Sequence, residues 1–316
     1  MNHKMKERIL VTGGAGYIGS ILVPSLLRHG YKVTVLDNFM YKVSSLSASC
    51  LDEKLEIIKG DLRDEGLLSK IIPRFDCIIP LAAYVGAPLC DSDPFTSKLV
   101  NQDATLKLLK MISNNQKVIM PTTNSAYGTG DSDNYCDEES PLNPISSYAI
   151  QKVEVETALM EKHNSVSLRL ATVFGMSPKM RLDLLVNDFT YRACNDGYIV
   201  IYEGNFKRNY IHVTDVARSF IFCIENFSKM RNNIYNVGLS EANISKFELC
   251  ELIKKYIPNF YIHEAQFQKD KDQRNYIVSN KKIESFGFKP VIDLETGIKE
   301  LIKGFVTLNE RPYRNI

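Results

Sequence analysis

Several features that mark special classes of protein are absent from the sequence. There is no block of like charges, no low-complexity segment and no internal repeat. The stretch at residues 77–90, which has no charged residue, is too short to span a bilayer and contains two prolines. The net charge of +2 and the pI near 8.0 give no reason to expect a nucleic-acid or membrane partner.

The cysteines point to neither a metal site nor a disulfide framework. The seven cysteines are scattered and odd in number, and no two stand at the spacing of a metal-ligand pair. We therefore expect reduced thiols and no bound metal. The basic N-terminus is not followed by the apolar segment that a signal peptide needs, so we expect a cytoplasmic protein.

What the sequence does contain is the pattern of an ordinary globular protein. Apolar residues make up 44% and charged residues 24% of the 316 residues, enough for one large domain or two joined ones. Short apolar strands alternate with helical patterns through residue 170, which indicates an α/β fold with a Rossmann-type, doubly wound parallel sheet. We predict that this Rossmann domain covers residues 1–170, with later segments returning to it. A smaller C-terminal substrate domain is predicted over residues 171–316.

A glycine-rich turn lies between the first strand and the first helix. Residues 9–11 form an apolar run, and apolar residues recur at helical spacing over residues 18–27. Between them Gly13 permits a tight turn, Gly16 lets the backbone approach a pyrophosphate, and Gly19 allows the helix to pack closely on the strand. The start of the helix offers unpaired N–H groups to the phosphates. The pattern predicts a dinucleotide site; the alternative is a turn that binds no nucleotide.

An acidic residue follows the second strand at the distance expected of a ribose ligand. Residues 32–36 form this strand, and Asp37 comes directly after it. A carboxylate in this position accepts hydrogen bonds from the ribose hydroxyls and repels a 2′-phosphate. Because no arginine stands beside Asp37 in the sequence, NAD is favoured over NADP.

Other residues expected around the cofactor follow later strands. Asp61 comes after the strand at residues 55–59 and can meet the adenine, although it can equally cap the next helix. Ala82 and Ala83 follow another strand end and leave room for the cofactor. The complete predicted cofactor set is Gly13, Gly16, Tyr17, Ile18, Gly19, Asp37, Asn38, Asp61, Leu62, Leu81, Ala82, Ala83, Asn101, Tyr148 and Lys152.

Tyr148 and Lys152 are the pair expected to carry the chemistry. They stand four residues apart on one predicted helix, so both side chains can enter the same site. A lysine ammonium and an oxidised nicotinamide both favour the phenolate and lower its pKa from about 10. The phenolate can take a proton from a sugar hydroxyl, which Thr123 at a strand end also contacts. With sixteen tyrosines a chance Tyr-x-x-x-Lys is the alternative, and the preceding motifs weigh against it.

At these residues the chain resembles the extended short-chain dehydrogenase/reductases of the nucleotide-sugar epimerase/dehydratase family. Over nearly the whole chain the matching motifs are residues 12–19, 60–62, 81–83, 123, 148–152 and 208–215. The resemblance implies NAD in the first domain, a nucleotide sugar mainly in the second, and a catalytic triad of Thr123, Tyr148 and Lys152. It also implies that Arg208 and Arg274 grip the diphosphate, as guanidinium groups suit phosphate oxygens; surface ion pairs are the alternative.

Departures from the family pattern narrow the reaction. Sugar 4,6-dehydratases carry two acids after the catalytic threonine, whereas this chain has Asn124 and Ser125, which cannot act as acid or base. Dehydration is therefore disfavoured, and so is the related decarboxylation. Thr172 takes the place of the family's substrate-contacting asparagine, and Tyr84 either lines the sugar pocket or packs. The predicted substrate contacts are Tyr84, Asn124, Ser125, Thr172, Lys179, Arg181, Asn187, Arg208 and Arg274.

The basic loop at residues 177–183 resembles that of GDP-heptose 4-dehydrogenases from bacterial surface-polysaccharide pathways, and this resemblance supplies Lys179, Arg181 and Asn187 as contacts. We expect oxidation at C4 of a GDP-linked heptose or hexose. A nucleotide-sugar 4-epimerase is the close alternative, and a non-catalytic NAD-binding protein is the distant one. The resemblance also implies a homodimer through helices near residues 99–112 and 147–162.

Overall fold

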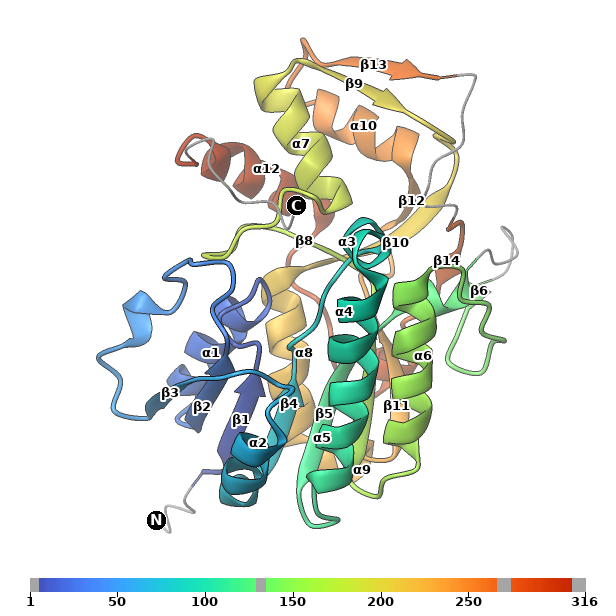
Figure 1. Cartoon of the computed structure of the whole chain (residues 1–316). Coiled ribbons are helices and arrows are strands. Elements are labelled where there is room, and N and C mark those ends of the chain that lie inside the picture. The colour runs from blue at the N-terminus through green and yellow to red at the C-terminus, as the bar shows by residue number, and fades with distance from the viewer. Residues whose placement is uncertain (1–5, 129–134, 266–273, 309–316) are drawn as a thin grey trace.

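The computed structural model describes residues 6–128, 135–265 and 274–308 (Figure 1). At its centre is a seven-stranded parallel sheet in the order β11-β7-β5-β4-β1-β2-β3. The strands are β1 (Arg8–Thr12), β2 (Lys32–Asp37), β3 (Leu55–Lys59), β4 (Cys77–Pro80), β5 (Lys117–Thr123), β7 (Ser165–Leu170) and β11 (Asn233–Val237). The direction of strand addition reverses between β1 and β4, where the carboxyl ends of such strands leave a crevice for a ligand. The predicted Rossmann-type sheet is confirmed.

Helices cover both faces of this sheet because its central strands are apolar on both sides. The covering helices are α1 (Gly19–Arg28), α2 (Glu65–Ile71), α5 (Thr105–Met111), α6 (Ser147–Met160) and α8 (Val213–Glu225). On one face α2, α5 and α6 bury side chains such as Val155 and Leu159. On the other face α1 packs beside α8 and buries Leu26 against Phe220 and its neighbours. Thus α8 and β11, both beyond residue 170, belong to the large unit.

A smaller unit lies over the carboxyl ends of the sheet (Figure 1). Its elements are α7 (Leu185–Asn195), α10 (Lys246–Lys254), α12 (Leu294–Phe305), β8 (Thr172–Phe174), β9 (Tyr198–Ile201), β10 (Lys207–His212), β12 (Asn243–Ser245) and β13 (Tyr261–Glu264). β10 lies between β8 and β12, and β9 pairs in parallel with β13. The unit has its own apolar core around Phe189, Leu249 and Leu301.

The helix predicted at residues 99–112 consists of two pieces, a π-helical segment η3 (Leu99–Ala104) and α5. Two short helices, α3 (Ala87–Ser92) and α4 (Pro94–Lys98), precede it. Asp93 caps α4 by accepting a hydrogen bond from the Thr96 N–H at 3.0 Å, and Pro94 suits the first turn. The spacing of apolar residues in the sequence does not predict the wider π-helical turn.

The remaining elements are short. They are η1 (Ser47–Ser49), η2 (Ile72–Arg74), η4 (Asn124–Tyr127), β6 (Tyr135–Cys136), α9 (Phe227–Met230), β14 (Ile277–Val278) and α11 (Lys281–Ser285), with β6 and β14 paired in parallel. Among the described residues, no helix combines the length and apolar character needed to cross a membrane.

Candidate active site

A cavity of about 490 Å³ lies at the switch point, between the strand ends and the smaller unit. The glycine turn, the ends of β2, β4 and β5, the start of α6 and the loop after β8 all line it. Thr123, Tyr148 and Lys152 face the same cavity as Gly13 and Asp37. Residues far apart in the chain are thus brought to one site, as the sequence motifs predict.

The glycine turn is shaped by backbone contacts that leave no room for side chains. Gly13 has a φ of +70°, and a Cβ there would lie 2.5 Å from the Ala82 nitrogen. A Cβ on Gly19, the first residue of α1, would lie 2.5 Å from the Gly14 carbonyl oxygen. Within the described ranges the N–H groups of Tyr17 and Ile18 have no backbone acceptor. A turn of this kind fits the pyrophosphate of a dinucleotide, with N–H groups at a helix start as its ligands.

Asp37 orders the turn and lines the cavity. Its carboxylate accepts hydrogen bonds from the Ala15 N–H at 2.9 Å and from the Phe39 N–H at 2.8 Å. Each oxygen keeps further acceptor capacity for a ribose hydroxyl. Asp37, which the sequence predicts as the ribose ligand, therefore also holds the glycine turn and the loop that follows β2 together.

Asp61 does not cap α2, so that alternative is wrong. The cap is Asp64, whose Oδ1 accepts from the Leu67 N–H at 2.9 Å. Asp61 pairs instead with Arg63 at 2.8 Å and accepts from the Asn38 amide at 3.2 Å. The hydrogen bonds from Arg63 hold the pKa of Asp61 well below its usual range. Because Asp61 neutralises Arg63, this cation at the cofactor end does not amount to a site for a 2′-phosphate.

The other predicted cofactor residues divide into two groups. Those that line the cavity are Gly16, Tyr17, Ile18, Gly19, Asn38, Leu62, Leu81, Ala82 and Ala83. Asn101 is buried and does not line it; its amide oxygen accepts from the Tyr84 N–H at 2.8 Å, and its NH₂ donates to the Tyr84 carbonyl and to Gln151, both at 2.9 Å. Asn101 therefore holds the segment after β4 in place and does not reach the cavity, because its amide is used by that backbone.

The three catalytic candidates sit on two elements that meet at the cavity. Thr123 ends β5, and its hydroxyl donates to Ser125 Oγ at 2.9 Å. Tyr148 and Lys152 lie in the first two turns of α6, which Ser146 caps by accepting from the Ala149 N–H at 3.2 Å. Lys152 is 6% exposed, and none of the described carboxylates pairs with it. Its Nζ lies 6.0 Å from the Tyr148 ring centroid.

Burial governs the protonation of this pair. It raises the pKa of Tyr148 to about 12, against the opposing charges of Arg181 and Arg274. It lowers the pKa of Lys152 to about 8. The sequence led us to expect that Lys152 would lower the tyrosine pKa. In the structure, Arg181 and Arg274 are the charges that lower it.

Further cations lie around the cavity. Arg274 donates to Ser125 Oγ, and Arg181 pairs with Asp183 and donates to the Val85 carbonyl at 3.3 Å. Lys179 lies over the ring of Tyr41, with Nζ 3.9 Å from its centroid. These three cations line the cavity, as do Tyr84, Ser125 and Thr172. Their charges suit a diphosphate.

Three predicted substrate residues do not line the cavity. Asn187 accepts from the Gly175 N–H at 3.0 Å and donates to the Arg181 carbonyl at 2.9 Å, so it shapes the loop after β8. Arg208 is buried, with its guanidinium 5.7 Å from the Tyr276 ring centroid. Asn124 is buried, and its amide has no hydrogen-bond partner among the described residues. The side chains of these three residues are buried, which their positions in the sequence do not show.

Sequence reasoning missed several residues that line the cavity. They are Met40, Tyr41, Lys42, Val43, Arg63, Val100, Ser146 and Leu184, among others. The first four belong to the loop after Asp37, whose closeness to the ribose acid was the one available signal. In the described part of the chain, no three His, Cys, Asp or Glu side chains form a group that would hold a metal ion.

Comparison with known proteins supports these assignments of fold and cofactor. The chain is 30% identical over 310 residues to a protein of Methanocaldococcus jannaschii named "Putative UDP-glucose 4-epimerase", covering 93% of this chain and 97% of that one. Among solved structures, the UDP-N-acetylglucosamine 4-epimerase of Methanobrevibacter ruminantium is 28% identical, with a TM-score of 0.82 and coverage of 96% and 99%. The UDP-glucose 4-epimerase of Thermus thermophilus in complex with NAD is 25% identical, with a TM-score of 0.81 and coverage of 95% and 99%.

The family profile matches the part of the chain that builds the sheet and the site. The match covers residues 9–238, from β1 to the end of β11, and includes the glycine turn, Asp37 and the Tyr148–Lys152 pair. The chain therefore belongs to the NAD-dependent epimerase/dehydratase family, with NAD as its cofactor.

Proposed function

We propose that the protein is a nucleotide-sugar 4-epimerase, which oxidises C4 of the sugar and then reduces the ketone from the opposite face. The observation that carries this proposal is that Thr123, Tyr148 and Lys152 line one cavity together with the glycine turn. The 4-epimerases among its relatives favour the same reaction. Oxidation at C4 is the step common to every catalytic alternative considered below.

The roles of the residues follow from their surroundings. Tyr148 takes the proton of the C4 hydroxyl, and Thr123 holds that hydroxyl with its own hydroxyl group. Bound NAD supplies the hydride acceptor and, when oxidised, a positive charge. Tyr148 needs that charge, since burial raises its pKa to about 12 in the protein alone. Lys152, buried without a carboxylate partner among the described residues, is placed to donate to the cofactor ribose.

The charges around the cavity argue against dehydration and decarboxylation. Of the described residues that line the cavity, Asp37 and Asp61 are the carboxylates, and both belong to the cofactor side. Ser125, beside Thr123, is held by Arg274 and cannot serve as a general acid. A site that eliminates water across two sugar carbons needs an acid at that position.

A GDP-heptose 4-dehydrogenase of surface-polysaccharide synthesis is the second candidate. The observation in its favour is that Lys179 and Arg181, from the loop that resembles those enzymes, do line the cavity. That reaction would release the ketone and leave reduced cofactor. The nucleotide base separates the candidates as well, because the relatives compared above are named for UDP-sugars.

We further propose that the protein is a homodimer through α6 and the helical run from α4 to α5, which includes the helix predicted at residues 99–112. Phe95 on α4 is 74% exposed and Ile150 on α6 is 43% exposed. Pairing these helices with those of a second copy would cover both side chains. Sedimentation that detects only monomer at micromolar concentration would refute this arrangement.

One experiment separates the catalytic alternatives. The purified protein is incubated with a panel of UDP- and GDP-sugars, GDP-heptose included, while nicotinamide absorbance is followed and the sugar is resolved by NMR. A new C4 diastereomer without net reduction of cofactor establishes the epimerase. A 4-keto sugar with reduced cofactor establishes the dehydrogenase. NAD and sugar binding without any turnover would leave a non-catalytic binding protein.

A further inference from the structure

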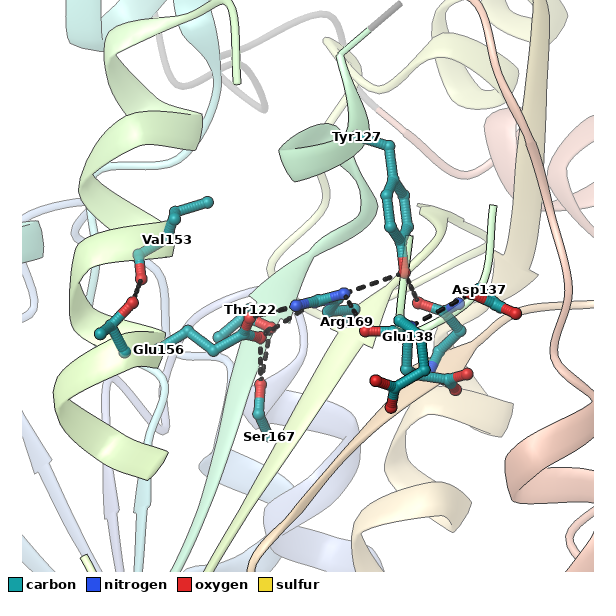
Figure 2. A network of polar contacts seen from close by, with 11 residues as sticks. Thr122, Tyr127, Asp137, Glu138, Val153, Glu156, Ser167 and Arg169 are labelled. Atoms are coloured by element: carbon teal, nitrogen blue, oxygen red, sulfur yellow. Dashed lines mark hydrogen bonds and ion pairs between the residues drawn. The ribbon is translucent and has the colours of Figure 1, made fainter. Parts of the chain in front are cut away.

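A buried polar network ties helix α6 to the central sheet, and Figure 2 shows its members. Glu156 on α6 is 4% exposed and Arg169 on β7 is 3% exposed. The guanidinium donates to Glu156 Oε1 from Nη2 at 2.7 Å and from Nε at 3.0 Å. Two hydroxyls donate to the other oxygen, Oε2: Thr122 Oγ1 at 2.7 Å and Ser167 Oγ at 2.6 Å. The carboxylate is therefore fully satisfied in the interior.

The network extends across neighbouring strands to the edge strand β11. Thr122 on β5 is paired in register with Arg169 on β7, and Arg169 with Asn236 on β11. Arg169 Nη1 donates to the Tyr127 hydroxyl at 3.0 Å, which in turn donates to Asn236 Oδ1 at 2.8 Å. In Figure 2 Arg169 lies between Glu156 on one side and Tyr127 on the other.

Stability alone is a weak reason for such a network. Desolvating two charges costs about as much as their attraction returns, and apolar residues of similar size often serve a core better. What the network does provide is fixed geometry, because each hydrogen bond of Glu156 joins α6 to a particular strand position.

Glu156 is positioned so that this fixed geometry affects the residues proposed for catalysis. Glu156 follows Lys152 by one helical turn and Tyr148 by two. Its partner Thr122 directly precedes Thr123 on β5. A single hydrogen bond, from Thr122 to Glu156, thus joins the helix that carries the base to the strand that carries the hydroxyl clamp.

We propose that Glu156 is a positioning residue, which through Thr122 fixes the distance between the Thr123 and Tyr148 hydroxyl groups. The inference rests on the proposed function, since it assigns Thr123 and Tyr148 to one sugar hydroxyl. Glu156 does not line the cavity, so it acts through the elements that it joins.

The structure offers a matched pair of variants to test this. Thr122→Val and Ser167→Ala each remove one of the two hydroxyl groups that donate to Oε2 of Glu156. Both variants leave the ion pair between Glu156 and Arg169 intact. The two variants release different strands from Glu156. Thr122 is next to Thr123 on β5, whereas Ser167 lies on β7. Thr122→Ser keeps the hydroxyl and serves as the rescue.

We expect Thr122→Val to lower kcat by about ten- to a hundredfold, as a misplaced reacting group does, with KM for the nucleotide sugar and Kd for NAD within about twofold of wild type. Ser167→Ala should keep kcat within about twofold of wild type despite a similar fall in Tm, and Thr122→Ser should restore kcat. Wild-type kcat in Thr122→Val, or equal losses of kcat in Thr122→Val and Ser167→Ala, would overturn the inference.

A second measurement needs no sugar and separates this inference from the proposed function. If the wild-type protein turns over none of the sugars, the proposed function fails, and crystal structures of wild type and both variants with NAD decide the positioning role. A changed distance between Thr123 Oγ1 and the Tyr148 hydroxyl oxygen in Thr122→Val alone supports it. An unchanged distance in that variant refutes it. Glu156→Gln is a less suitable test because it strands the buried charge of Arg169 and endangers folding.

Discussion

The ring of Tyr41 lies beneath the ammonium group of Lys179, with Nζ 3.9 Å from the ring centroid. Tyr41 belongs to the loop after β2 of the large unit, and Lys179 to the loop after β8 of the small unit. Both line the cavity, so their contact joins the two units at its edge. Burial lowers the pKa of Lys179 to about 8, with the nearby charge of Arg181 adding to the effect.

Loss of this ring should loosen the substrate side of the cavity. A cation–π contact contributes about 0.5–2 kcal/mol, so Tyr41→Leu should weaken nucleotide-sugar binding by roughly two- to thirtyfold. Tyr41→Phe keeps the ring and should bind nearly as wild type does. Titration calorimetry with UDP-glucose or GDP-mannose measures both, and equal losses in the two variants would show that the hydroxyl, not the ring, matters.

Tyr148→Phe should separate binding from chemistry. The variant keeps the ring but cannot accept the proton, so turnover should fall by about 10²–10⁴-fold while NAD binding stays within about twofold. NAD binding is followed by calorimetry and turnover by NMR of the sugar. Tyr261→Phe, at an exposed position on β13, is the matched control and should behave as wild type. Retained turnover in Tyr148→Phe would disprove the assigned base.

Lys152 should lower the free energy of unfolding of the NAD-free protein at neutral pH. Burial lowers its pKa from 10.5 to about 8, so between these values the unfolded chain binds more protons than the folded one. The free energy of unfolding contributed by this group therefore rises with pH through that window and is lowest below pH 8.

Lys152→Met removes that penalty. Its gain in unfolding free energy over wild type should be about 3 kcal/mol larger at pH 7 than at pH 10.5. Urea unfolding of both proteins at the two pH values measures the difference. The exposed Lys98→Met variant is the control, having no burial to relieve. A gain in Lys152→Met that does not change with pH would contradict the burial of a charge.

Gly13→Ala should abolish NAD binding. The added Cβ would meet the Ala82 nitrogen at 2.5 Å and its Cα at 2.6 Å, both of them backbone atoms that cannot turn aside. Gly197 is the matched control, with nearly the same φ of +72° and nothing within 4 Å of an added Cβ. Gly197→Ala should cost about 1–2 kcal/mol from its left-handed backbone alone and leave NAD binding unchanged. Calorimetric titration and urea unfolding compare the two.

The sequence predicts best those residues whose role depends on local spacing. Gly13, Gly16 and Gly19 act through one strand–turn–helix unit, and Tyr148 and Lys152 through two turns of one helix. Such local units have the same geometry in whatever fold they occur, so the motif alone identifies these residues as lining the cavity. The parallel sheet follows in the same way from the alternation of strands and helices.

The residues that the sequence misplaces depend on packing between distant segments. Asn101 is turned toward Gln151 of α6 and the backbone of Tyr84, and Asn187 toward Gly175 and Tyr17. No local pattern specifies which way such amides point. Tyr41 was missed for the same reason, because its partner Lys179 is supplied by a loop of the other unit.

The place of β11 in the sheet has a consequence for how the chain is made. Its five residues, 233–237, pair with β7 along the edge of the large unit, while most of the small unit lies before and after them in the chain. During synthesis the edge of β7 stays open until residue 237 has left the ribosome. Neither unit is a single continuous segment of the chain, so cleavage of one peptide bond cannot separate either unit intact. The fragment 1–170 would lack both its edge strand and the helix that covers α1, and should be recovered as aggregate.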